Sequence, residues 1–65
     1  MATRDAFREF RNLGRSALGA TESKEIQHAI DAVYQAVHSR AVVGKRAKRL
    51  RGLRRTLEQK LSRPV

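Results

Sequence analysis

The strongest helical pattern in the chain lies in residues 21–40, TESKEIQHAIDAVYQAVHSR. Its apolar side chains recur three and four residues apart, which is the spacing of one face of an amphipathic helix. They are Ile26, Ala29, Ile30, Val33 and Val37. Acidic residues lie in the first turn and basic residues near the end, as the helix dipole favours. Because the segment also carries little net charge, we expect it to form the central helix of the core.

Two further segments with helical spacing lie on either side of it. In the first, the apolar positions are Ala6, Phe7, Phe10, Leu13 and Ala17. In the second, they are Val43, Ala47, Leu50, Leu57 and Leu61, with Leu53 at the edge of the face. The sequence therefore predicts helices over about residues 3–19, 21–39 and 43–62.

The predicted fold class is all-α, because no segment shows the alternation of a strand. Gly44 is the one residue that favours a break between the second and third segments, so a continuous helix over 21–62 remains open. The expected architecture is a hairpin or bundle of two or three helices in one small domain, residues 1–65. About a dozen large apolar positions make a thin core for one chain, and we therefore expect a homodimer.

Composition restricts the chemistry of this 65-residue chain, which has a net charge of +9 and no cysteine. Without cysteine there are no disulfides, no zinc fingers and no thiol catalysis. His28 and His38 are ten residues apart on one helix, too far to bind one metal ion within a chain. No nucleophile, acid–base pair or metal set is visible, so we expect neither an enzyme nor a cofactor.

Basic residues are concentrated in residues 44–55, GKRAKRLRGLRR, where seven of twelve are Lys or Arg. Leu50 and Leu53 keep the helical period there, which indicates a folded helix more than a charged tail. The outer face of this helix is expected to carry Lys45, Lys48, Arg49, Arg51 and Arg55. The first helix adds a stripe of Arg4, Arg8, Arg11 and Arg15. If both faces point the same way, nine cations could neutralise many phosphates of a nucleic acid.

The side chains available for reading bases favour a duplex over a single strand. Single-strand binders stack bases on exposed aromatic rings, whereas the three aromatics here lie on or beside apolar faces: Phe7, Phe10 and Tyr34. Of these, Tyr34 could still reach the rim of its face and touch a ligand. Few amide side chains could read base edges, so we expect little sequence preference. A DNA-reading helix usually carries Gln, Asn, Ser or Thr beside Arg, and the third helix has almost none on its outer face. Double-stranded RNA, which is read by shape and backbone, is therefore favoured over DNA.

Other roles for a basic amphipathic helix remain open. It could dock onto an acidic protein partner, as in an inhibitor or antitoxin-like module, or belong to a subunit of a ribonucleoprotein. The run KRAKRLRGLRR also fits a loose nuclear address. The layout of compact basic helices suggests a small nucleic-acid-binding accessory protein, which could be encoded by a virus, phage or plasmid.

We expect the chain to be soluble and intracellular. No apolar run approaches the roughly 18 residues of a membrane span. Asp5 and Glu9 argue against a mitochondrial presequence, since such segments are poor in acidic residues. The third helix also lacks the Trp and Phe typical of a membrane-surface helix.

Arg54 does not fit the pattern, because an ideal helical wheel places it within the apolar arc of the third helix. Three arrangements are open: the helix bends near Gly52 and turns the side chain out to solvent, the side chain reaches solvent along its stem, or the guanidinium is paired. The candidate partners are Glu58 on the same helix and three acidic residues of the second: Glu22, Glu25 and Asp31.

Overall fold

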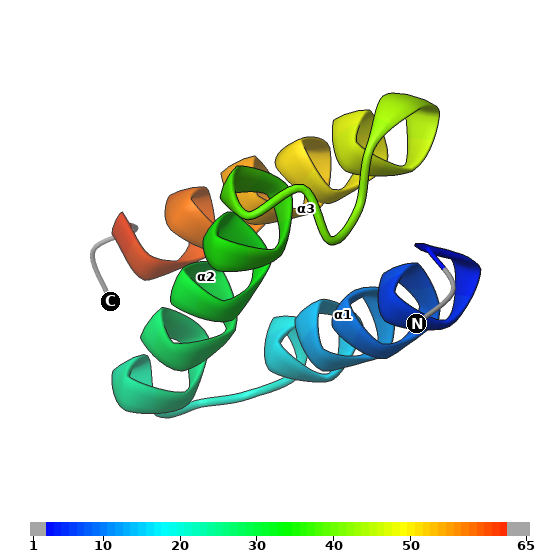
Figure 1. The fold of residues 1–65 in the computed structure, drawn as a ribbon. Helices are drawn as coiled ribbons and strands as arrows, with labels where there is room; N and C mark the ends of the chain where they lie inside the picture. The colour runs from blue at the N-terminus through cyan, green and yellow to red at the C-terminus, as the bar shows by residue number, and fades with distance from the viewer. Residues whose placement is uncertain (1–2, 63–65) are drawn as a thin grey trace.

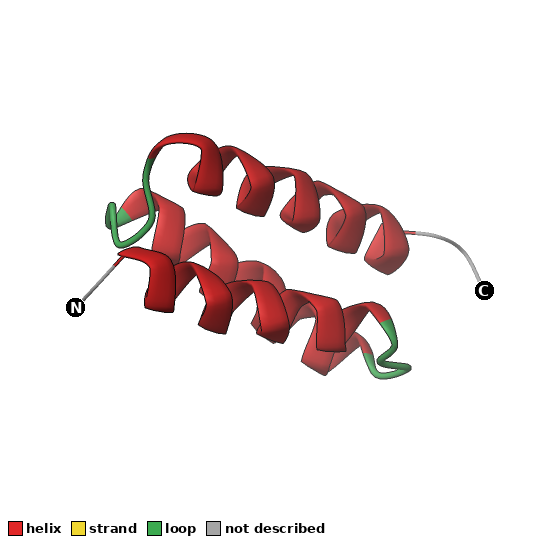
Figure 2. Ribbon diagram, turned by 90° about the vertical axis from the view of Figure 1, so that its right-hand side faces the viewer, coloured by secondary structure: helices red, strands yellow, loops and turns green. Residues whose placement is uncertain are grey.

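The computed structural model describes residues 3–62 of the chain. Within them are three helices and no strand: α1 (Thr3–Leu18), α2 (Ser23–His38) and α3 (Gly44–Ser62). Each helix contacts the other two. Helices α1 and α3 run side by side in the same direction, and α2 runs in the opposite direction and packs against both (Figure 1, Figure 2). The all-helical class is confirmed, and of the two architectures expected the structure is the three-helix bundle.

The helix ends lie within two residues of the expected ranges 3–19, 21–39 and 43–62. Helix α2 begins at Ser23 because Glu22 before it is extended, with φ −90° and ψ 129°. The possibility of a continuous helix over 21–62 is wrong. Arg40 takes the left-handed region at φ 62° and Gly44 at φ 68°, and these two residues turn the chain between α2 and α3.

The core consists of two apolar clusters that share Leu53. The first lies toward the α2–α3 loop and is made of Ala6, Phe7, Val33, Ala36, Val42, Ala47 and Leu50, with Phe10 and Val37 packed against it. The second lies toward the α1–α2 loop and is made of Ala17, Ile26, Ala29, Ile30 and Leu57, with Leu13 and Leu61 beside it. All three helices supply both clusters, so the apolar stripes predicted from the sequence cover one another.

One predicted core position is wrong. Val43 was assigned to the apolar face of the third helix, yet its side chain is 51% exposed while Val42 is fully buried. The reason is that α3 begins only at Gly44. A helical wheel does not apply to residues 39–43, where the loop turns Val42 inward instead.

None of the helices within residues 3–62 is both long enough and apolar enough to cross a membrane.

Candidate nucleic-acid interface

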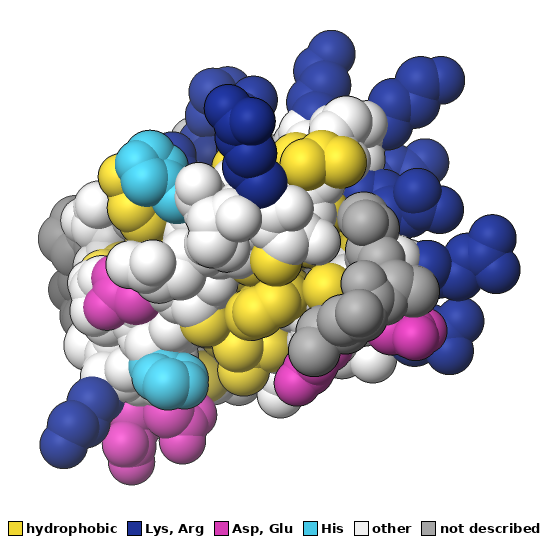
Figure 3. All heavy atoms as spheres, viewed as in Figure 1, with side chains coloured by type: hydrophobic (Ala, Val, Ile, Leu, Met, Phe, Trp, Pro, Cys, Tyr) yellow, Lys and Arg dark blue, Asp and Glu magenta, His cyan; other side chains and the backbone are white. Residues whose placement is uncertain are grey.

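The structure places all nine predicted cations on the two helices that carry the basic surface. On α1, Arg4, Arg8 and Arg15 are exposed and Arg11 is half-buried. On α3, Lys45, Lys48, Arg49, Arg51 and Arg55 are all exposed. In the view of Figure 3, Lys and Arg side chains gather along α3 and the adjoining end of α1. The hollows between the helices show which of these cations lie close together.

Three of the nine cations line one open hollow of about 190 Å³ between α1 and α3. They are Arg11 and Arg15 from α1 and Arg49 from α3, and the remaining wall is apolar: Phe7, Leu50 and Leu53. Two helices that are separated in the chain by all of α2 and its two flanking loops thus bring like charges together at one edge. Repulsion between the three positive charges makes such a cluster unfavourable by itself, and a bound anion would stabilise it.

The close approach of α1 and α3 explains why these arginines meet. Gly14 of α1 is buried and faces the side chain of Leu53 on α3. Arg11 and Arg15 lie one turn before and one residue after Gly14, and Arg49 lies one turn before Leu53. With no side chain at Gly14, the helix axes come close enough for their flanking arginines to share a hollow.

Arg11 is the most desolvated of the three. Its Nε atom is buried and has no hydrogen-bond partner among the residues described. Its guanidinium carbon lies 5.6 Å from the centroid of the Phe7 ring, a cation–π contact. A buried donor without a partner costs about 1–3 kcal/mol, so an anion that reached this group would relieve an existing penalty.

The cations of α3 do not form one flat surface. Arg49 and Arg51 are two residues apart and therefore point to nearly opposite sides of the helix. Arg51 lies on the α2 side, where it lines a second hollow, of about 410 Å³, together with Arg40. The apolar part of that hollow comes from Val37, Val42, Val43 and Ala47. Helix α3 is therefore a ridge with cations on both flanks, and the nine cations do not share one face.

Arg54 combines two of the arrangements expected for it. Its Nε lies 3.0 Å from Glu58 Oε1, an ion pair one turn along the same helix that does not have the geometry of a hydrogen bond, and its side chain stays 32% exposed. Its guanidinium carbon also lies 5.2 Å from the centroid of the Tyr34 ring on α2. The pair with Glu58 was foreseeable from their spacing of four residues. The contact with Tyr34 was not, because it depends on how α2 packs on α3.

Sequence reasoning also missed the part that Arg40 takes in the second hollow. The sequence places Arg40 among the basic residues near the end of the segment 21–40, which gives it no more than a favourable interaction with the helix dipole. It lies in the α2–α3 loop, where no helical period assigns a side, and so only the folded chain brings it to Arg51.

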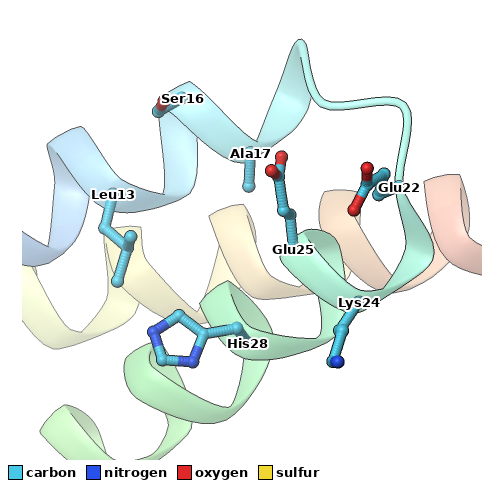
Figure 4. Close-up of a pocket in the computed structure, with 7 residues that line it drawn as sticks. All are labelled: Leu13, Ser16, Ala17, Glu22, Lys24, Glu25 and His28. Atoms are coloured by element: carbon cyan, nitrogen blue, oxygen red, sulfur yellow. The ribbon is translucent and has the colours of Figure 1, made fainter.

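A third hollow, of about 460 Å³, lies between the end of α1 and the start of α2 (Figure 4). Its apolar lining is Leu13 and Ala17, and its polar lining is Ser16, Glu22, Lys24, Glu25 and His28. Its two carboxylates would repel a phosphate, so we do not assign it to the basic interface. No group of three His, Asp or Glu side chains that could hold a metal ion occurs within the described part of the chain.

Comparisons with protein-family models, with curated proteins and with solved structures each find no match for this chain.

Proposed function

We propose that this protein binds the phosphate backbone of a nucleic-acid duplex through the basic side chains of α1 and α3. The observation that carries the proposal is the convergence of Arg11, Arg15 and Arg49 on one hollow. An isolated basic helix would project its charges separately, whereas here the bundle holds three guanidinium groups around one site. Arginine suits such a site because its planar fork matches phosphate oxygens.

The flanking cations extend this site along the duplex. Arg4 and Arg8 continue the α1 stripe on the same side as Arg11 and Arg15. From Arg4 to Arg15 the stripe rises about 16 Å at 1.5 Å per residue. A duplex carries one phosphate charge per ~1.7 Å of its axis, so the stripe can meet several phosphates. On α3, Lys45, Lys48 and Arg55 lie between the two flanks marked by Arg49 and Arg51.

We favour double-stranded RNA over DNA, with little sequence preference. Gly52 and Gln59 lie on the same exposed side of α3 as Lys48 and Arg55. Gln59 is therefore the one amide side chain on that side that can read a base edge. Recognition would then come from backbone charge and duplex shape, which is how double-stranded RNA is usually bound.

A titration against salt tests the proposal. A labelled blunt RNA duplex, its DNA equivalent and the separate single strands are titrated by fluorescence anisotropy at several salt concentrations. The logarithm of the RNA duplex affinity should fall linearly with the logarithm of the salt concentration, with a slope of several units. A flat response would remove the proposal, and stronger binding of single strands than of either duplex would refute the preference for a duplex.

Matched variants locate the interface. Arg15→Gln and Arg49→Gln should each weaken binding and reduce the salt slope by about one unit. Lys24→Gln is the control, since it removes the same charge from an exposed position between Glu22 and Glu25, away from the basic hollow. An equal effect of all three changes would mean that net charge and not this site determines binding. Tight binding to one acidic protein, with weak binding to every nucleic acid, would favour a protein-interaction module.

The homodimer belongs to the same proposal. The three apolar stripes cover one another in a single chain, and Val33, Val42 and Leu57 are fully buried there. Covering the core is therefore no reason for a second copy, and a dimer would serve instead to double the basic surface on a duplex. Sedimentation velocity with and without RNA measures the oligomeric state. Identifying the partner would show whether the protein has an accessory role in a virus, a phage or a ribonucleoprotein.

A further inference from the structure

Tyr34 is the aromatic residue that the core does not use. The chain has two Phe, one Tyr and no Trp. Phe7 is buried in the first core cluster and Phe10 packs against it. Tyr34 belongs to neither cluster and is 40% exposed, and its ring lies against Arg54 of α3. Of the three aromatic residues expected on or beside apolar faces, the two phenylalanines thus pack in the core, and Tyr34 is the one left exposed.

Two neighbours hold the Tyr34 ring in place. The His38 ring, one turn along α2, stacks on it with centroids 4.6 Å apart and planes 22° from parallel. Tyr34 Oη and His38 Nε2 are 3.4 Å apart, a weak hydrogen bond. The Arg54 guanidinium approaches the Tyr34 ring from α3, 5.2 Å from its centroid. Three flat groups from two helices are thus assembled at one exposed place before any ligand arrives.

The charge of Arg54 has a partner on its own helix. Glu58 lies 3.0 Å from its Nε and offsets the positive charge. Phosphate binding through Arg54 would have to compete with this ion pair, whereas stacking would not. The assembly is therefore suited to an uncharged flat group, and nucleobases stack on both aromatic rings and guanidinium planes.

Two cations without an ion pair among the described residues lie close in the chain to Arg54 and His38. Arg51 precedes Arg54 by three residues, a rise of about 4.5 Å along α3. Arg51 and Arg40 line one hollow, which also includes Val37, the residue next to His38. Arg40 is held in the left-handed region at φ 62°, where glycine is the residue of least strain. A ligand bound by the Arg40 side chain would explain why arginine and not glycine occupies this strained position.

We propose that Tyr34, His38 and Arg54 form a stacking site for one unpaired nucleobase, and that Arg40 and Arg51 hold the phosphate next to it. The inference rests on the proposed function and makes it more specific. The preferred ligand is a duplex with an unpaired nucleotide, such as a short overhang or a bulge. Backbone contacts from α1 and α3 supply the affinity for the duplex, and the stacking site selects the unpaired base.

The test compares two RNA duplexes that differ in bases and not in phosphates. Both carry a short single-stranded overhang of the same length. The overhang has ordinary nucleotides in one duplex and abasic nucleotides in the other, and a blunt duplex is the reference. The wild-type protein should bind the base-bearing overhang at least about 5-fold more tightly than the abasic one. The two salt slopes should be equal, because the number of phosphate contacts is the same.

Variants of Tyr34 assign the preference to this site. Tyr34→Leu should abolish the discrimination between the two overhangs and leave binding of the blunt duplex unchanged. Tyr34→Phe keeps a ring and should retain most of the discrimination. Because Tyr34 is the chain's one tyrosine and there is no tryptophan, quenching of intrinsic tyrosine emission reports stacking directly. The base-bearing overhang should quench this emission and the abasic overhang should not.

The outcomes separate this inference from the proposed function. Salt-dependent binding of the blunt duplex, with equal affinity for the two overhangs, would overturn the stacking site alone. Unchanged discrimination in Tyr34→Leu would overturn it as well. If the wild-type protein bound neither duplex, the proposed function would be refuted. The ratio of its affinities for base-bearing and abasic single strands would then still test the stacking site.

Discussion

At the scale of single residues, Gly14 determines how α1 meets α3. By helix propensity alone, glycine there costs up to about 1 kcal/mol relative to alanine. In the folded chain, a Cβ added at Gly14 would lie 2.9 Å from Leu53 Cγ and closer still to its Cδ2. Leu53 packs against both core clusters, so moving it disturbs both. The packing therefore reverses the preference that propensity gives.

We predict that Gly14→Ala lowers the free energy of unfolding by about 1–2 kcal/mol, because overpacking outweighs the gain in propensity. Gly52→Ala is the matched control, since nothing lies within 4 Å of a Cβ added there. It should raise the free energy of unfolding by about 0.5–1 kcal/mol. Urea denaturation followed by far-ultraviolet circular dichroism measures both. A Gly14→Ala protein as stable as Gly52→Ala would contradict the close contact with Leu53.

At the scale of elements, the end of α2 is closed by an unusual residue. The Ser39 N–H donates to Gln35 O at 2.9 Å and the Arg40 N–H donates to Val37 O at 3.2 Å. Arg40 then takes φ 62°, in the position after a helix where glycine is most common. The turn directs Val42 into the core and sets where α3 starts. Its geometry is thus needed for the fold, but its arginine side chain is not.

We predict that Arg40→Gly raises the free energy of unfolding by about 0.5–1 kcal/mol. Glycine removes the strain of the left-handed conformation, and this gain is partly offset because glycine has a larger chain entropy in the unfolded state. Gly44→Ala tests the same turn in the other direction, because Gly44 has φ 68°. It should destabilise the protein by about 1 kcal/mol. Thermal denaturation of the two variants beside the wild type gives both values. A drop in stability for Arg40→Gly would show that the arginine side chain supports the fold.

At the scale of the whole molecule, the charge is very unevenly distributed. The chain has fifteen Lys and Arg against six Asp and Glu. Helix α3 alone has eight of those cations and one acidic residue, Glu58, and its first turn has none. These charges lie on a small body whose Cα radius of gyration is 11.4 Å. Their mutual repulsion opposes the compact state.

We predict that added salt raises the Tm, because screening weakens this repulsion. The same salt should lower the affinity for duplex RNA, since phosphate contacts are screened and counterion release is reduced. Differential scanning calorimetry over a range of sodium chloride concentrations measures the first effect. A Tm that falls as salt is added would mean that ion pairs such as Arg54–Glu58 outweigh the repulsion between cations.

Much of the local structure was determined by the sequence by itself. Apolar side chains spaced three and four apart predicted the three helices, because that period depends on helix geometry alone. The same period showed that the basic residues 44–55 form a helix, and the spacing of Arg54 and Glu58 allowed their ion pair. Where the period stops, in residues 39–43, prediction failed, and Val43 was placed in the core instead of Val42.

The tertiary structure decided which side chains meet across helices. The approach of α1 to α3 at Gly14 gathers Arg11, Arg15 and Arg49 around one hollow. The packing of α2 on α3 places Arg54 against Tyr34, and the α2–α3 loop brings Arg40 to Arg51. A helical wheel gives the direction of each side chain within its own helix. The contacts between helices depend on the distance and rotation of packed neighbours, which periodicity does not contain.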